Sequence, residues 1–423
     1  MKQRFLCVLL AAVLCLSVLS GCAAQKRTDK SAESGEPKAS TEKVPQAEST
    51  EPTHGINQPA ASPLGFTNFD SSLIAFLCEN GYAEENFAVS PLSFRAALAL
   101  AASGAEGETL NQLLAVMGFS SVEQMNAWYA DVLAGVDRFD DSFNSEFVPR
   151  GDAAYRVVNS VWSNESLPGE FRPDYVQAVR DRLRAEAASA PGEELADAVN
   201  KWVNDQTNGL IPKLLNDAAD ASAILVNALY LKAAWRAPFV SAGTNPFTTS
   251  AGETVEKDFM EITSSFSYYE DESCQLVSVP LEGGISMVFV LGESENLDQK
   301  LSRAEWTRVH VTVPKFDLST SFDNSELKRF LLTLGCDRMF SDAAGFDPMF
   351  TEPFFVDDIV QKTKIKIYEE GLEAAAATAV IMKNGAAPIP EHPKEFRADS
   401  AFSFYLIQEG GAPELLFWGQ IVK

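Results

Sequence analysis

The amino-acid sequence predicts an α+β domain built on a large β-sheet. Two nearly all-apolar runs, Ala223–Leu231 and Ile285–Leu291, are typical of strands buried on both faces. Amphipathic helical patterns are interleaved with these strands over roughly 360 residues, from Pro63 to Lys423. Strands so far apart in the chain favour a sheet with non-local pairing, and this length permits one large domain.

The N-terminus is expected to direct export, with residues 1–21 as a signal peptide. Lys2 and Arg4 precede an apolar run that is shorter than an ordinary membrane span. The stretch Leu19-Ser-Gly-Cys22 resembles a bacterial lipobox, in which the peptide is cut before the cysteine and lipid is attached to it. That resemblance implies an extracytoplasmic protein, anchored through Cys22 to the bacterial envelope or surface. An ordinary signal peptide and secretion are the alternative.

Residues 22–62 are predicted to be the lipidated cysteine and a disordered tether. From Ala23 to Ser62 the chain is mostly Lys, Glu, Ser, Thr, Pro, Gln and Ala, which cannot bury enough apolar surface to offset the entropy of ordering. The remaining residues, 63–423, are expected to form the single folded domain.

Helices are predicted from their caps and apolar stripes. Ser90 can cap a helix that opens with Pro91, because proline lacks the N–H that the first turn leaves unpaired. A second amphipathic helix starts near Glu193 and ends before Asn208-Gly209. A third helical pattern covers residues 324–334.

Further strands are predicted where polar and apolar residues alternate. Val309–Val313 alternates cleanly and places His310 on its polar face, and strand patterns also cover residues 354–368 and 402–407. Asn227, in the middle of the first apolar run, is expected to be a buried amide that must find hydrogen-bond partners.

Charge and missing motifs exclude several functions. A formal charge of −25 argues against nucleic acid as a partner. Beyond the signal and Cys22 only Cys78, Cys274 and Cys336 remain, which suits buried free thiols better than a disulfide framework or metal site. No hydrolase triad, zinc motif or phosphate-binding glycine loop is present. We therefore expect no catalysis, no metal and no cofactor.

The segment Glu369–Pro388 reads EEGLEAAAATAVIMKNGAAP and is compatible with two structures. Its alanines favour a helix. At a period of two it also fits a strand, since Leu372, Ala374, Ala376, Thr378, Val380 and Met382 share one face, and Glu373 and Lys383 lie on the other. From this window alone, a surface helix and an insertable strand are equally compatible.

The chain resembles the serpin family, through motifs that follow one another in family order. They are the helix start Asn86-Phe-Ala-Val-Ser-Pro-Leu-Ser93, Gly104–Leu113 with its Gly-Ala-x-Gly-x-Thr signature, Asn200–Gly209, Val226–Trp235, Val313-Pro-Lys-Phe316, Phe340–Phe346 and the alanine-rich stretch. The resemblance covers essentially all of residues 63–423. It implies three β-sheets, eight or nine helices and an exposed reactive-centre loop at about residues 369–398.

The resemblance also implies a mechanism of protease inhibition. A serine endopeptidase, or a cysteine endopeptidase, would cleave the loop as a substrate, and the loop would insert into the main sheet while still esterified to the protease. The implied loop hinge consists of Glu369, Glu370, Gly371, Leu372, Glu373, Ala374, Ala375, Ala376, Ala377 and Thr378. Inhibitors of the family usually carry Thr or Ser where this chain has Leu372. Leucine is apolar and should still bury, so we expect inhibition to survive.

Three further sets of residues follow from the same resemblance. The "shutter" under the sheet would be Ser90, Ser93, Asn227 and Gln361, with Gln361 in place of the usual histidine, and Trp235 would be the "breach" residue where the loop enters. Counting from the hinge glycine places the reactive bond at Gly385-Ala386, with Asn384 and Lys383 as alternatives. Small residues there suggest an elastase-like or subtilisin-like target, whereas cleavage after Lys383 would mean a trypsin-like one. The protein is expected to be monomeric.

Two other functions remain open from the sequence. One is a serpin-fold protein on the cell surface that binds or carries a ligand and does not inhibit. The other is a surface lipoprotein enzyme or solute-binding protein.

Overall fold

A computed structural model describes residues 66–143, 153–293, 296–322, 325–372, 392–410 and 413–423. Among these residues there are eight α-helices, within the expected number: α2 Asn68–Leu77, α3 Pro91–Ala102, α4 Gly107–Met117, α5 Val122–Ser142, α6 Pro173–Leu183, α7 Gly192–Gln206, α8 Leu297–Ser302 and α9 Glu326–Thr333. The predicted helix starts are confirmed for α3, where the Ser90 hydroxyl accepts a hydrogen bond from the Ser93 N–H, and for α7.

The six-stranded sheet is the main sheet of the molecule. Its strand order is β10-β11-β12-β4-β2-β3. The strands are β10 Phe316–Phe322, β11 Asp358–Tyr368, β12 Gly371–Leu372, β4 Ala223–Ala234, β2 Ala154–Asn164 and β3 Glu186–Ala190. Strand β4 has eleven of its twelve residues buried, which confirms the apolar run as a doubly covered strand. The strand predicted from residue 354 begins later, at Asp358.

The second sheet has nine strands in the order β1-β15-β14-β8-β7-β6-β9-β13, with β5 also paired to β6. They are β1 Phe87–Val89, β15 Glu414–Ile421, β14 Phe402–Gln408, β8 Ile285–Gly292, β7 Cys274–Leu281, β6 Thr254–Glu270, β9 Glu305–Pro314, β13 Lys394–Arg397 and β5 Val240–Thr248. The described strands thus form two hydrogen-bonded sheets where three were expected. The reason is β6, whose 17 residues pair with β5 at one end and β7 at the other.

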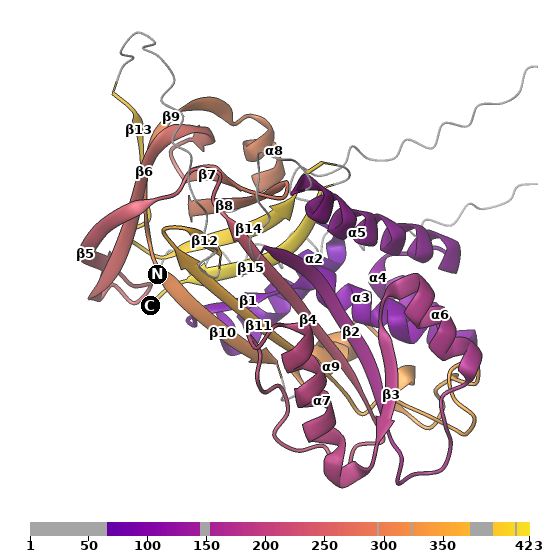
Figure 1. Cartoon of the computed structure of the whole chain (residues 1–423). Coiled ribbons are helices and arrows are strands. Elements are labelled where there is room, and N and C mark those ends of the chain that lie inside the picture. Colours follow the sequence, from indigo (N-terminus) through magenta and orange to yellow (C-terminus); the bar gives the residue numbers. More distant parts are fainter. Residues whose placement is uncertain (1–65, 144–152, 294–295, 323–324, 373–391, 411–412) are drawn as a thin grey trace, which may run out of the picture.

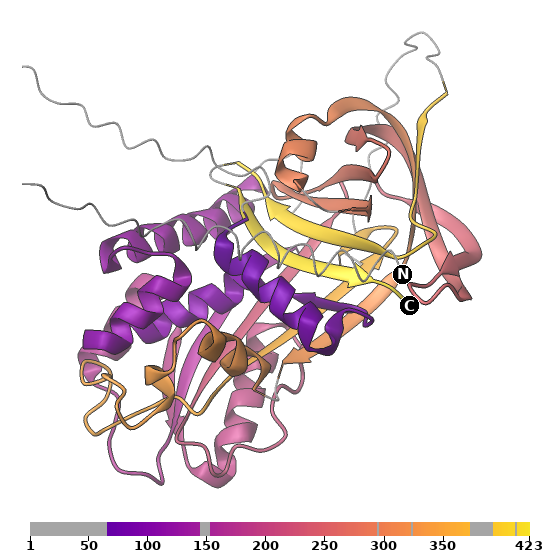
Figure 2. The same cartoon turned by 180° about the vertical axis from the view of Figure 1, so that it is seen from behind.

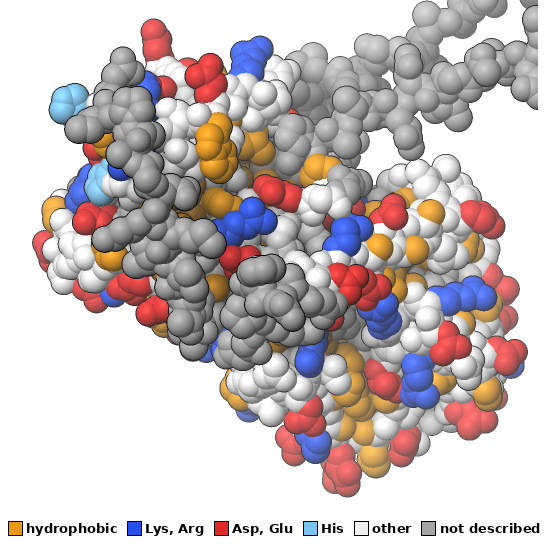
Figure 3. Space-filling view, turned by 45° about the horizontal axis from the view of Figure 1, so that its top comes forward, with side chains coloured by type: hydrophobic (Ala, Val, Ile, Leu, Met, Phe, Trp, Pro, Cys, Tyr) orange, Lys and Arg blue, Asp and Glu red, His pale blue; other side chains and the backbone are white. Residues whose placement is uncertain are grey.

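Helices cover the main sheet on both faces (Figures 1 and 2). Helices α3 and α5 lie against β2 on one face, and α3 also lies against β4, while α7 lies against β2 and β3 on the other. All twelve residues of α3 are buried, which explains its alanine content, because small side chains let it pack closely beneath the sheet. Acidic and basic side chains are interspersed over the face shown in Figure 3.

A buried charged cluster joins the helices to the nine-stranded sheet. Arg95 in α3 lies 3.8 Å from the carboxylate of Glu414 in β15, and its guanidinium stacks 4.2 Å from the ring centre of Trp128 in α5. The Trp128 indole also donates a 3.1 Å hydrogen bond to Glu414. Burial raises the pKa of Glu414 to about 7, with Arg95 opposing the shift and nearby Asp70 adding to it.

Glu414→Gln is predicted to reduce the pH dependence of stability. A carboxyl whose pKa is raised by folding contributes stability at pH below its unfolded value, 4.5, and that contribution is lost as the pH rises through about 7. The free energy of unfolding of wild type should therefore fall relative to that of the variant by about 2–3 kcal/mol between pH 4.5 and pH 8. Chemical unfolding of both proteins at the two pH values measures this difference. Parallel stability curves over this range would contradict the assignment.

Candidate functional site

The main sheet forks between its central strands. At one end β11 and β4 pair directly and in parallel, from Asp358 with Ile224 to Gln361 with Asn227. At the other end β12 lies between them, because Leu372 pairs with both Ile367 of β11 and Ala233 of β4. The two-residue strand is antiparallel to both neighbours and directly precedes Glu373 and the alanines of the alanine-rich segment.

The register of the two strands is the same on both sides of the fork. Gln361 and Asn227, which pair directly, are 134 positions apart, and so are Ile367 and Ala233, which flank Leu372. The strands have therefore separated sideways by one strand, about 4.8 Å on each side of β12, without sliding along each other. A strand can lie between Lys362–Ile367 of β11 and Ala228–Ala233 of β4 without changing any other pairing in the sheet.

Four buried side chains meet where direct pairing ends. The Gln361 side chain accepts a hydrogen bond from the Ser90 N–H (3.2 Å) and donates to the Ser90 carbonyl (3.0 Å) and to the Asn227 side-chain oxygen. Ser93 donates to the same Asn227 oxygen (3.4 Å), and the Asn227 amide donates to the Val360 carbonyl (3.1 Å). The structure thus brings together all four residues that resemblance assigned to the shutter, each with no exposed surface.

The same region contains a polar residue that the sequence analysis did not single out. Asn159 of β2 is opposite Asn227 in register and is 1% exposed, yet among the described residues its side-chain amide makes no hydrogen bond of normal geometry, only a weaker interaction with the buried Tyr129 hydroxyl. A poorly paired buried amide is costly, so its position beside the cluster is a feature that packing alone does not explain. The signal that could have identified it was an asparagine that follows two valines in the run Val157-Val-Asn-Ser-Val-Trp162.

Trp235 lies at the open end of the fork, where β12 separates β11 from β4. It is 2% exposed and its indole N–H donates a 2.9 Å hydrogen bond to the Tyr368 carbonyl. Its backbone N–H donates to the Glu370 carbonyl at 3.0 Å, and the Phe239 N–H donates to the Glu369 carbonyl at 2.9 Å. The turn that leads from β11 into β12 is therefore held by Trp235 and its neighbours, at the position that resemblance called the breach.

The first hinge residues each have a defined contact. The Glu369 carboxylate forms an ion pair with Lys315, with 3.0 Å between Glu369 Oε1 and Lys315 Nζ, and both side chains are mostly buried. Gly371 has a φ of 148°, and a Cβ atom there would lie 2.3 Å from the Ala233 carbonyl oxygen. Only glycine fits this close approach to β4. The site's hinge glycine is thus a steric requirement as well as a conformational one.

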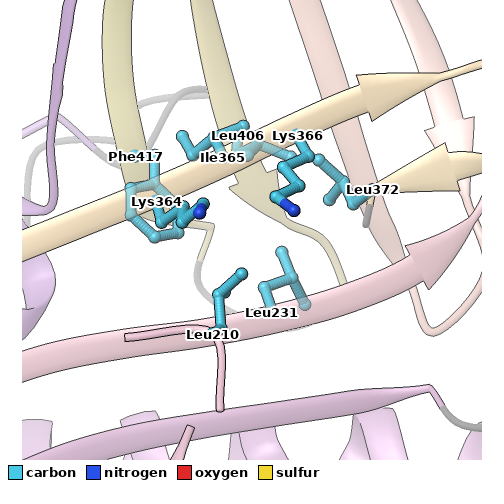
Figure 4. A pocket seen from close by; sticks show the side chains of 8 residues that line it. All are labelled: Leu210, Leu231, Lys364, Ile365, Lys366, Leu372, Leu406 and Phe417. Carbon is cyan, nitrogen blue, oxygen red and sulfur yellow. The ribbon is translucent and has the colours of Figure 1, made fainter. Parts of the chain in front are cut away.

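Leu372 is 3% exposed and packs in the same apolar cluster as Ile367 and Ala233. A small cavity opens immediately beyond it, between β11 and β4 (Figure 4). Its lining comes from both sides of the sheet and consists of Leu210, Leu231, Lys364, Ile365, Lys366, Leu372, Leu406 and Phe417. Burying a leucine side chain is worth about 1.5–3 kcal/mol, so an apolar residue is favourable at this point of the hinge.

The other residues assigned from resemblance lie outside the described residues. They are Cys22, the hinge residues Glu373, Ala374, Ala375, Ala376, Ala377 and Thr378, and the reactive-bond candidates Lys383, Asn384, Gly385 and Ala386.

Other chemistry is sparse in the described part of the chain. It contains no group of three or more His, Cys, Asp or Glu side chains arranged to hold a metal. The described helices include none that is both long and apolar enough to cross a membrane. Cys78, Cys274 and Cys336 are buried free thiols, as predicted. His310 is half-buried at the sheet surface, where its ring is 2.8 Å from the Thr263 hydroxyl.

Gln361→Met is predicted to destabilise the intact protein by about 1–3 kcal/mol, because methionine fills the volume but removes three buried hydrogen bonds and leaves the Ser90 N–H without a partner. Guanidinium chloride unfolding measures the change. Gln299→Met, at an exposed position of α8, is the matched control and should change stability by less than about 0.5 kcal/mol. Equal effects of the two substitutions would show that the hydrogen bonds of Gln361 contribute nothing specific.

Comparison with known proteins identifies the family. The profile of the serpin family, described as serine protease inhibitors, matches residues 66–423. The leukocyte elastase inhibitor of Bos taurus is 30% identical over 388 residues, which cover 84% of this chain and 97% of that protein. Leukocyte elastase inhibitor A of Mus musculus is 31% identical over 374 residues, or 79% of this chain and 92% of that protein.

Solved structures agree on the fold. A highly specific serpin from the insect Tenebrio molitor superposes with a TM-score of 0.68 at 27% identity, covering 83% of this chain and 95% of its own. Human thyroxine-binding globulin superposes with a TM-score of 0.70 at 21% identity, covering 84% and 96%, and so supports the fold alone. The forked sheet, its polar cluster and the family match together show that the chain belongs to the serpin family, a family of serine protease inhibitors and not of enzymes.

Proposed function

We propose that this protein inhibits serine endopeptidases by trapping them as covalent acyl-enzymes after cleavage of its reactive-centre loop. The observation that carries the proposal is β12, the two residues Gly371–Leu372 of the alanine-rich segment, which lie between β11 and β4 in a register that admits a longer strand. The loop itself supplies the rest of that strand after cleavage.

The geometry divides insertion into two stages. Five residues of each strand, Lys362–Lys366 and Ala228–Lys232, separate Leu372 from the direct pair Gln361–Asn227. Residues 373–377 would fill this interval without breaking a direct pair between β11 and β4. Thr378 is the first residue that would have to displace the Gln361–Asn227 pair, so the polar cluster resists the second stage.

The target is proposed from the reactive bond. Gly385-Ala386 suits a protease with a small specificity pocket, elastase-like or subtilisin-like, and the similarity to leukocyte elastase inhibitors supports the elastase-like choice. A trypsin-like target would use Lys383 instead. We further propose that the protein is a bacterial lipoprotein attached through Cys22, which would place the inhibitor at the cell surface on the tether of residues 22–62.

Incubation with an elastase-like protease is predicted to give a complex that survives SDS, together with a released C-terminal fragment. Mass spectrometry of that fragment should identify Ala386 as its first residue, and a fragment beginning with Asn384 would indicate a trypsin-like target. If elastase-like, subtilisin-like and trypsin-like proteases gave only cleaved protein, and cleavage brought no gain in stability, the serpin-fold binding function would be favoured instead.

Ala376→Glu is predicted to convert the inhibitor into a substrate. Ala376 shares the face of buried Leu372, so insertion would bury an unpaired carboxylate. Ala375→Glu places the same charge one residue away, on the outer face between Lys364 and Tyr230, where the lysine can pair with it, and should lose less SDS-stable complex than Ala376→Glu. The relative amounts of complex and cleaved protein measure both. Equal loss of complex in the two variants would contradict the assigned faces.

Cys22→Ser is predicted to abolish incorporation of labelled palmitate during expression in a bacterial host, because the lipid would be attached to that thiol. Cys15→Ser, within the signal peptide, is the control and should retain the label. Loss of label in both variants, or in neither, would count against a lipid anchor at Cys22.

A further inference from the structure

Lysine side chains line the outer face of the fork. In β11 Lys362, Lys364 and Lys366 are half-buried and alternate with buried Thr363, Ile365 and Ile367. In β4 the half-buried residue is Lys232, between buried Leu231 and Ala233. Leu231, Ala233, Ile365 and Ile367 belong to the apolar cluster that holds Leu372, so the lysines lie on the opposite face of the sheet. Figure 4 shows Lys364 and Lys366 beside the opening.

The register specifies which loop residue would meet these lysines. Leu372 is paired with Ile367 and Ala233, so the next residue, Glu373, would lie between Lys366 on one side and Lys232 on the other. Its side chain would point outward with theirs, because successive residues of a strand alternate between faces. Glu373 is the sole acidic residue from Gly371 to Pro390, and its first position in the fork has a lysine on both sides.

We propose that Lys366 and Lys232 form a docking rung for Glu373, an ion-pair site on both neighbouring strands that holds the entering loop in the register begun by β12. The inference rests on the proposed function. Directly opposed charges on neighbouring strands attract, and a shift of one residue would turn Glu373 into the apolar face beneath the sheet. Lys366 now lies 3.7 Å from Asp317 of β10, so Glu373 would share this lysine with a half-exposed partner.

The test is a double-mutant cycle on loop insertion. Wild type, Glu373→Gln, Lys366→Gln and the double variant are cleaved in the loop, and the rise in the guanidinium chloride unfolding midpoint on cleavage is compared. In parallel, the ratio of cleaved inhibitor to SDS-stable complex is measured with an elastase-like protease. Each single substitution is expected to raise that ratio about two- to fivefold, which corresponds to the strength of one cross-strand ion pair. The double variant should resemble the single variants.

Lys364→Gln provides the matched control, since it is on the same strand and face but is opposite Ala375. Its effect should simply add to that of Glu373→Gln. In a background of Asp317→Asn, which removes the acidic neighbour of position 366, the charge-reversed pair Glu373→Lys with Lys366→Glu should recover part of the activity that Glu373→Lys alone loses, which a structural role of either residue would not produce. Additive effects of Glu373→Gln and Lys366→Gln, or no recovery on reversal, would overturn the rung. Absence of any midpoint rise in cleaved wild type would instead overturn the proposed function.

Discussion

The structure depends on one geometric constraint, the constant register of β4 and β11 across the fork. Two parallel strands that are bonded at one end and separated by one strand at the other can keep their order only if they move apart without sliding. Every neighbouring strand then retains its pairings, as β2 and β10 do here along the flanks. The opening is therefore compatible with an intact core on both faces of the sheet.

Opposing interactions hold the two ends of the fork. At the closed end, Gln361, Asn227, Ser90 and Ser93 satisfy one another in a site with no access to water, where a broken hydrogen bond is costly. At the open end, Trp235 and Lys315 fix the turn that leads into β12, and Gly371 allows the backbone to approach β4. The two strands are thus held together by polar contacts at one end and separated by β12 at the other.

The presence of a glutamine in the polar cluster has a physical consequence. Gln361 makes three hydrogen bonds through one amide, using both its oxygen and its nitrogen. An amide does not titrate near neutral pH, so Gln361 gives the polar cluster no protonation switch. The buried carboxyl with a pKa near neutrality, Glu414, lies elsewhere, between α3, α5 and β15.

The sequence by itself determined the local structure and the family. Local sequence predicted the apolar strand β4, the Ser90 cap of α3 and the amphipathic helix α7, because these features depend on neighbours within a few residues. The number and spacing of the cysteines predicted the free thiols. Motifs in family order gave the serpin fold and pointed to the residues of the polar cluster.

Only the tertiary structure decided how these elements meet. The fork and its register involve residues more than 130 positions apart, and periodicity along one strand carries no information about its partner. The continuity of β6 through two parts of one sheet, the poorly paired amide of Asn159 and the lysines beside Leu372 likewise depend on long-range packing. The segment that starts at Glu369 was compatible with helix and strand by sequence, and for its first residues the steric fit of Gly371 and the burial of Leu372 select the strand.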